Sequence, residues 1–119
     1  MYEYAAQVVR VIDADTVVLD VDLGFDTSRR DIFRLYGINA AEHGTPSGDA
    51  ATAYLTAILT VGLEITVSTH KDKFDKYGRM LAVLTTPDGK SVNDELVATG
   101  HAAPYFGVGP RPVPPPPAP

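Results

Sequence analysis

Apolar and polar residues alternate along the first half of the chain, as they do in half-buried β-strands. Valine and leucine occupy every second position of residues 17–23, and Asp20 and Asp22 lie between them. This period of two predicts a strand with one buried face. Residues 5–11 have a β-rich composition, and residues 13–15 form a predicted tight turn. The chain therefore begins with two predicted strands joined by a turn.

Three further strands are predicted from the same kind of pattern. Residues 32–38 form the third strand, which ends around Gly37. Residues 63–68 alternate between apolar and polar side chains and form the fourth. Residues 80–85 form the fifth, which the turn residues 87–89 close.

The first of two predicted helices follows the third strand. Thr45 is its predicted N-cap, because Pro46 then occupies the first helical turn, where a missing N–H does no harm. Asp49 lies near the positive end of the helix dipole, and Gly62 ends the helix. The apolar stripe expected to face the core consists of Ala51, Tyr54, Leu55 and Ile58.

The second predicted helix begins at Ser91, has Asp94 three residues later in a capping pattern, and ends at Gly100. The residues expected to face the core are Val92, Leu96 and Val97. Three strands, a helix, two strands and a further helix give the element order of an OB-type barrel. We therefore expect an α+β, mainly β fold, namely a five-stranded OB-type β-barrel with two helices.

The composition changes near the end of the chain. Residues 1–103 are expected to form one domain, and residues 104–119 a proline-rich C-terminal tail with extended polyproline II structure. One interpretation of the tail is a flexible tail or linker. The other is a ligand for a partner domain that recognises proline.

The net charge of −5 and the pI near 4.9 argue against nucleic-acid binding, because proteins that bind phosphates are usually basic. The basic residues are nevertheless concentrated in two short clusters. These are Arg29, Arg30 and Arg34, followed by Lys71, Lys73, Lys76 and Arg79. One local positive patch is therefore compatible with the composition, and we expect weak, salt-sensitive binding to nucleic acid.

Several features that the sequence lacks narrow the classes of function. The absence of cysteine excludes disulfides, thiolate zinc sites and cysteine nucleophiles. No apolar run approaches the ~20 residues of a membrane span, so no membrane association is expected. The N-terminus lacks the basic start and apolar stretch of a secretory signal, and we expect an intracellular protein unless a signal was removed. No oligomerisation feature is visible, so a monomer is expected.

Three polar segments are candidates for chemistry. Asp13 and Asp15 are separated by one residue at a turn. They are interpreted either as part of an ordinary polar turn or as two carboxylates that converge on a hard cation. Arg34, inside an apolar strand, either pairs with a buried carboxylate or grips phosphate oxygens. Glu42 is either solvated surface or a general base. Arg79 follows a polar turn, and its functional interpretation places it opposite Arg34 across a phosphate.

Four sequence motifs together resemble those of the staphylococcal nuclease (thermonuclease-like) family. They read DADTV at residues 13–17, FRLYGINAAE at 33–42, DKYGRMLA at 75–82 and VNDELVATG at 92–100. Each motif alone is weak, but all four occur in the family's order and at compatible spacing. The resemblance covers about residues 5–105.

The resemblance implies a calcium-dependent nuclease that hydrolyses DNA and RNA with little sequence preference and leaves 3′-phosphates. Glu42 matches the family's general base, which activates the attacking water. Arg34 and Arg79 match the two arginines that brace the phosphate and stabilise its transition state. The positions that match substrate contacts are Lys76, Tyr77 and Tyr105, the last at a shorter spacing than in the family.

The resemblance also implies a metal site for Ca²⁺. Asp15 matches a metal-binding carboxylate, Asn39 the second ligand position and Ala40 the position whose backbone carbonyl completes the site. The family pattern has aspartate where this chain has Asn39, and an asparagine oxygen binds calcium without contributing charge. We therefore expect weakened calcium affinity. Residues 40–41 replace threonine-proline, and a proline tail stands where the founding member has a further helix.

A catalytically weak or inactive OB-fold module that binds nucleic acid or a protein partner is the alternative function. Asn39 and the acidic net charge favour it. Glu42 together with Arg34 and Arg79 favours an enzyme, because a binding module does not need all three. The histidines match no motif position and are interpreted as polar surface or locally bonded residues; they are His43, His70 and His101.

Overall fold

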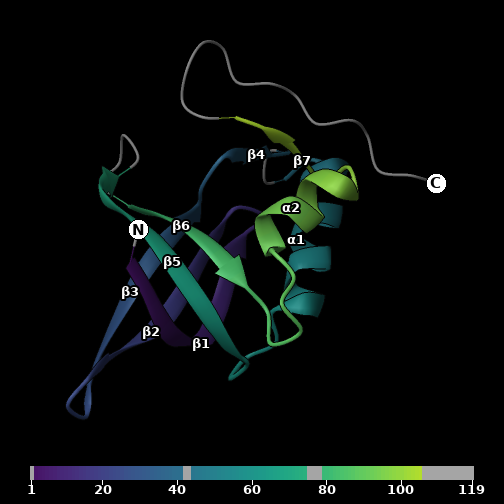
Figure 1. Cartoon of the computed structure of the whole chain (residues 1–119). Helices are drawn as coiled ribbons and strands as arrows, with labels where there is room; N and C mark the ends of the chain where they lie inside the picture. The colour runs from purple at the N-terminus through teal and green to yellow at the C-terminus, as the bar shows by residue number, and fades with distance from the viewer. Residues whose placement is uncertain (1, 42–43, 75–78, 106–119) are drawn as a thin grey trace.

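The computed structural model describes residues 2–41, 44–74 and 79–105, with the backbone alone for residues 70–74. The strands of its barrel are β1 (Tyr2–Asp13), β2 (Thr16–Gly24), β3 (Thr27–Leu35), β5 (Glu64–Phe74) and β6 (Met80–Thr85). They close in the order β1-β2-β3-β6-β5 (Figure 1). Paired strands are antiparallel except β3 and β6, which are parallel. With two helices added, this confirms the predicted five-stranded OB-type barrel.

Residue alternation along β2 determines which side chains fill the barrel. The turn at Ala14 and Asp15 joins β1 to β2 as predicted. Val17, Leu19 and Val21 are all buried. Leu23 was predicted to share their face and is instead 45% exposed. The prediction fails there because β1 pairs with β2 only as far as Val21, so the last residues of β2 project beyond the barrel.

The third strand was predicted at residues 32–38, but β3 begins and ends earlier. Its polar residues 27–31 are strand because they pair with residues 19–24 of β2, partly beyond the point where β1 stops. Cross-strand hydrogen bonding therefore outweighs the absence of an apolar pattern. Phe25 and Asp26, both in the left-handed region with φ of 56° and 57°, form the hairpin tip. At its other end β3 stops before Gly37, whose φ of 79° suits glycine.

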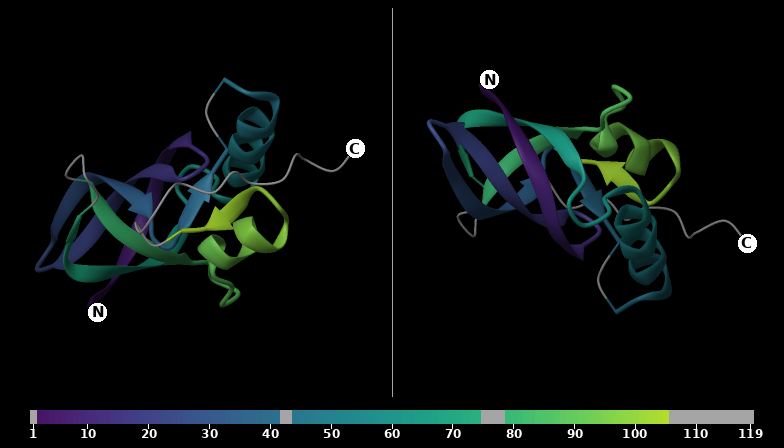
Figure 2. Two further views of the ribbon diagram at one scale, coloured as in Figure 1. Left: turned by 90° about the horizontal axis from the view of Figure 1, so that it is seen from above. Right: turned by 90° about the horizontal axis from the view of Figure 1, so that it is seen from below.

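Both helices form where the sequence predicts them, α1 at Pro46–Ile58 and α2 at Val92–Ala98. The Thr45 and Ser91 side chains cap them by accepting hydrogen bonds from the amides of Gly48 and Asp94 at 3.0 and 3.3 Å. Both helices lie toward one end of the barrel, and the β2–β3 hairpin points away from them (Figure 2). No helix in the described part of the chain is long and apolar enough to cross a membrane.

A second, two-stranded sheet was not predicted. It pairs β4 (Ile38–Ala40) with β7 (Ala102–Pro104) in antiparallel register. The Tyr105 amide extends the pairing by donating to the Gly37 carbonyl at 2.8 Å. Pairing thus continues two residues past residue 103, the predicted end of the domain, while residues 106–119 of the predicted tail lie outside the described residues. The sheet fixes the segment that follows Gly37 against α2.

Asn93 of α2 ties the helix to the backbone of two strands. Its side chain is buried, with 3% of the residue exposed. Its Nδ2 donates to the carbonyls of Tyr36 and Ala82 at 2.8 and 3.1 Å, and its Oδ1 accepts from the Leu84 amide at 3.2 Å. One side chain therefore supplies hydrogen-bond partners to backbone groups at the end of β3 and along β6. Buried backbone polar groups need such partners.

We expect Asn93→Ala to lower the free energy of unfolding by about 2–4 kcal/mol, because it leaves the Leu84 amide and the Tyr36 carbonyl without this partner. Urea unfolding measures the change. The exposed Thr60→Ala is the control, with an expected change of at most about 0.5 kcal/mol. Equal, small changes for both variants would contradict a bracing role for Asn93.

Candidate active site

Strand register brings separated segments of the chain to one end of the barrel. Thr16 at the start of β2 is paired with Arg34 near the end of β3, and Arg34 is paired with Leu81 of β6. Asp15 directly precedes Thr16, and Arg79 directly precedes β6. The pairing therefore gathers Asp15, Arg34 and Arg79, which the sequence keeps far apart.

Asp15 and Arg34 form an ion pair at the centre of this end. Arg34 Nη2 lies 3.4 Å from Asp15 Oδ2, and the two side chains are only 9% and 17% exposed. The Leu35 amide donates to the Asp15 carbonyl at 2.8 Å, so the backbone beside each residue is also joined. Because both charges are largely removed from water, loss of either one leaves the other poorly solvated.

Arg34 also reaches the strand that follows it. Its Nη2 donates to Asn39 Oδ1 at 3.4 Å, as well as to Asp15. The structure is therefore compatible with both interpretations of Arg34, as a partner of a buried carboxylate and as a phosphate-binding residue. Arg34 pairs with a partly buried carboxylate, and its guanidinium lies among the other predicted site residues.

The backbone of β4 presents Ala40 to Asp15. Because Tyr105 bonds to Gly37 and antiparallel pairs alternate, the backbone groups of Gly37 and Asn39 face β7 and those of Ala40 face away from it. The Ala40 amide accordingly approaches Asp15 Oδ2 at 3.5 Å. A residue's N–H and C=O leave a strand on the same side, so the Ala40 carbonyl also lies on the Asp15 side.

Arg79 joins the cluster through a residue that the sequence analysis did not single out. Arg79 Nη1 donates to Thr16 Oγ1 at 3.3 Å, and Thr16 Oγ1 donates to Asp15 Oδ1 at 3.1 Å. Thr16 is buried at 3% exposure, although it is polar. Its place in the DADTV motif was the available signal, and it was interpreted only as the start of a strand. Asn93, which lies in the VNDELVATG motif, was missed in the same way.

The remaining predicted site residues are placed less completely. Glu42, Lys76 and Tyr77 lie outside the described residues. Tyr105 is partly buried at the end of the β4–β7 sheet. Among the histidines, His101 packs against Tyr54 with ring centroids 4.7 Å apart, in agreement with a locally bonded residue.

The first basic cluster divides between two places. Arg34 belongs to the site, but Arg29 and Arg30 lie on the projecting β2–β3 hairpin, where they pair with acidic neighbours. Arg30 Nε lies 2.7 Å from Asp20 Oδ1, and Arg29 Nη2 lies 3.0 Å from Asp31 Oδ2. The Arg30 hydrogen bond holds the pKa of Asp20 below its ordinary value. These two arginines therefore do not extend the positive patch at the site.

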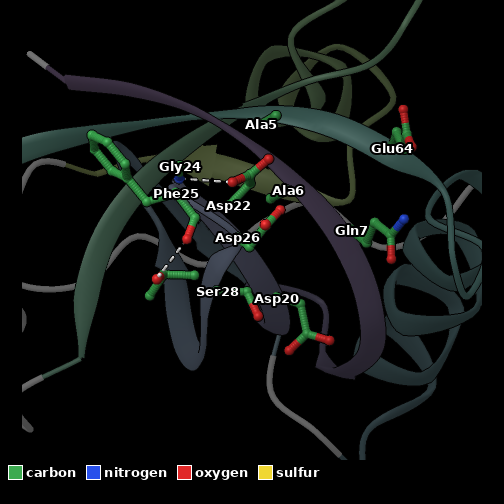
Figure 3. A pocket seen from close by; sticks show the side chains of 11 residues that line it. Ala5, Ala6, Gln7, Asp20, Asp22, Gly24, Phe25, Asp26, Ser28 and Glu64 are labelled. Atoms are coloured by element: carbon green, nitrogen blue, oxygen red, sulfur yellow. Dashed lines mark hydrogen bonds between the residues drawn. The ribbon is translucent and has the colours of Figure 1, made fainter.

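A cavity of about 590 Å³ lies beside the same hairpin, away from this site. Asp20, Asp22, Asp26 and Glu64 line it (Figure 3). Such a lining repels phosphate groups. Gly24, next to the hairpin tip, lies ~26 Å along β2 from Thr16, at about 3.3 Å per residue. The acidic cavity and the Asp15–Arg34 pair therefore lie toward opposite ends of β2.

Comparison with known proteins decides the family. The family model described as staphylococcal nuclease homologue matches residues 32–113. The chain belongs to the staphylococcal nuclease family. The chain is also 36% identical over 115 residues to Endonuclease YhcR of Bacillus subtilis (strain 168), an alignment that covers 87% of this chain and 9% of that protein.

Two Escherichia coli proteins, each named an uncharacterized endonuclease, are similar to the chain as well. The protein from strain O157:H7 is 34% identical and the other 33% identical, each over 99 residues. These alignments cover 83% of this chain and 60% of each relative. The chain thus spans less than two thirds of the length of these relatives.

Members of the family are expected to bind calcium, and the described residues offer a partial set of ligands. No group of three or more histidine, cysteine, aspartate or glutamate side chains in the described residues is placed to hold a metal. The Asp15 carboxylate, the Asn39 amide oxygen and the Ala40 carbonyl are nevertheless oxygen donors, which a hard cation prefers. The Arg34 guanidinium lies 3.4 Å from both side chains and opposes a cation there. These oxygen donors are of the type that calcium prefers, but Asp15 alone among the three contributes a negative charge.

Proposed function

We propose that the chain is a calcium-dependent nuclease that hydrolyses phosphodiester bonds of DNA and RNA with little sequence preference. The observation that carries the proposal is the linked cluster of Arg34, Asp15, Thr16 and Arg79 at one end of the barrel. Two guanidinium groups gathered at one place in a chain with a net charge of −5 suit the binding of an anion such as a phosphate group. Membership of the family and the names of the relatives support the same activity.

The two arginines stabilise the transition state in this proposal. Attack on a phosphodiester increases negative charge on the oxygens around phosphorus, and guanidinium donors fixed in advance stabilise that charge more than the ground state. Arg34 is fixed by Asp15 and Asn39, and Arg79 by Thr16. Each guanidinium carries N–H donors in a planar fork whose geometry matches the oxygens of a phosphate group.

Glu42 is the proposed general base that takes a proton from the attacking water. It follows Ala40, the last residue of β4, by two positions, so chain connectivity ties it to the described cluster. A glutamate near its reference pKa of about 4.3 is ionised at neutral pH and accepts a proton. The residues proposed to contact the neighbouring phosphate and the nucleoside are Lys76, Tyr77 and Tyr105.

Asp15, Asn39 and Ala40 would hold the calcium ion. When bound, calcium supplies positive charge that offsets the charge developing on the phosphate oxygens. The Asp15 carboxylate is shared with Arg34, and Asn39 brings no charge of its own. We therefore propose weak calcium binding. This weakness is also the observation that favours the second candidate function, a module that binds nucleic acid or a protein without cutting.

The roles of the arginines can be tested by the same substitution, arginine to lysine, at three positions. Arg34→Lys and Arg79→Lys keep the positive charge but lose the planar fork, so each is expected to lower kcat/KM on single-stranded DNA about 100-fold. Arg30→Lys, on the hairpin, should leave kcat/KM nearly unchanged. Cleavage assays in millimolar calcium measure the ratios. Equal activity of all three variants would contradict the proposed site, and binding without cutting by the wild type would favour the module.

The second prediction concerns the missing charge of the metal site. Asn39→Asp adds one unit charge at a ligand position, worth about 1–4 kcal/mol at ~4 Å across surface-like and water-like dielectrics. Calcium affinity should therefore rise about fivefold or more. Ser28→Asp adds the same charge on the distant hairpin and should leave the affinity unchanged. Calorimetric titration with calcium measures Kd, and an Asn39→Asp variant with the wild-type Kd would refute the assignment of Asn39.

A further inference from the structure

Thr16 connects the carboxylate on the proposed metal side of the site to an arginine on the phosphate side. Its hydroxyl donates to Asp15 Oδ1 at 3.1 Å and accepts from Arg79 Nη1 at 3.3 Å. We infer that the Thr16 hydroxyl is a positioning group that holds Arg79 and Asp15 in a fixed mutual arrangement for phosphodiester hydrolysis. The inference rests on the proposed function.

The polarity of these two contacts is determined by chemistry alone. A guanidinium only donates hydrogen bonds and an ionised carboxylate only accepts them. The Thr16 hydroxyl must therefore accept from Arg79 and direct its single proton to Asp15. Hydrogen bonds in such a chain polarise one another, and both outer partners carry charge. The hydroxyl thus orients the Arg79 guanidinium through a hydrogen bond, which an apolar side chain of the same shape cannot do.

Strand pairing on both sides holds the backbone of Thr16 in place. Thr16 is paired with Asp13 of β1 and with Arg34 of β3, and 3% of the residue is exposed. A β-branched side chain in a strand also has few χ1 rotamers. Arg79, by contrast, carries a long side chain with several rotatable bonds. The contact therefore transfers the rigidity of the barrel to the Arg79 guanidinium.

The same geometry joins the two arginines of the site. Arg34 contacts Asp15 at 3.4 Å, Asp15 contacts Thr16 and Thr16 contacts Arg79. Arg34 and Arg79 are thus linked through only two small groups, one of which is the hydroxyl. Removing the hydroxyl breaks this series of contacts between the two arginines and leaves Asp15 and Arg34 in contact.

The test is a matched pair of substitutions in the full chain. Thr16→Val removes the hydroxyl and keeps the β-branched shape, and Thr16→Ser keeps the hydroxyl. Nitrogen-15 relaxation of the Arg79 Nε–H group reports the order of the guanidinium without any substrate or metal. The Arg30 Nε–H group, bound to Asp20, is the internal control. Steady-state kinetics on single-stranded DNA in millimolar calcium follow for each variant, with thermal unfolding as a check on folding.

The order parameter of the Arg79 Nε–H group is expected to fall in Thr16→Val and to stay close to the wild-type value in Thr16→Ser. The order parameter of the Arg30 Nε–H group should be the same in all three proteins. The kcat of Thr16→Val should fall by about 10–100-fold, as is typical when a supporting group is lost, with a smaller change in KM. A merely structural Thr16 would lower the unfolding temperature and leave Arg79 order and kcat as they are. That result overturns the inference.

Failure of the proposed function gives a different result. A wild-type protein that cuts no nucleic acid in calcium refutes the nuclease assignment, whereas the Arg79 order parameter still decides whether Thr16 positions that arginine. An order parameter that is the same in wild type and Thr16→Val refutes the positioning role even in an active nuclease.

Discussion

Three residues of β3 pair in parallel with three residues of β6, and this short contact closes the barrel. Asn93 braces the closure from α2 through hydrogen bonds to the backbone of Tyr36, Ala82 and Leu84. Arg34 lies in the middle of the closing segment and Arg79 directly precedes β6. The distance between the two proposed phosphate-binding residues therefore depends on the same pairing that makes the barrel a closed structure, which couples stability to activity.

A cluster of charges at low exposure is unfavourable unless its members satisfy one another. Here Arg34, Asp15, Thr16 and Arg79 are linked by three contacts, and no buried side-chain polar atom in the described part of the chain lacks a hydrogen-bond partner. The cluster is thus assembled in the protein without substrate, as electrostatic stabilisation of a transition state requires. The cavity beside the β2–β3 hairpin is lined by acidic side chains and is unfavourable for a polyanion.

Sequence reasoning predicted the barrel, both helices and their caps because these features depend on local patterns. It failed where distant pairing decides the outcome. Leu23 is exposed because β2 extends past β1, and residues 27–31 form strand because they pair with residues 19–24 of β2. The β4–β7 sheet joins two three-residue strands, too short for any periodic signal. The motifs predicted Asp15, Arg34, Asn39 and Arg79 as site residues by resemblance, but Thr16 became visible only through the geometry of its hydroxyl.

The central claim is that this end of the barrel hydrolyses phosphodiesters with calcium and Glu42. The most direct measurement incubates the purified protein with single-stranded DNA in millimolar calcium, beside a chelator control and the Glu42→Gln variant. The account predicts cutting by the wild type that disappears with the chelator and with Glu42→Gln. An absence of cutting at high calcium, or cutting that persists in Glu42→Gln, would contradict it.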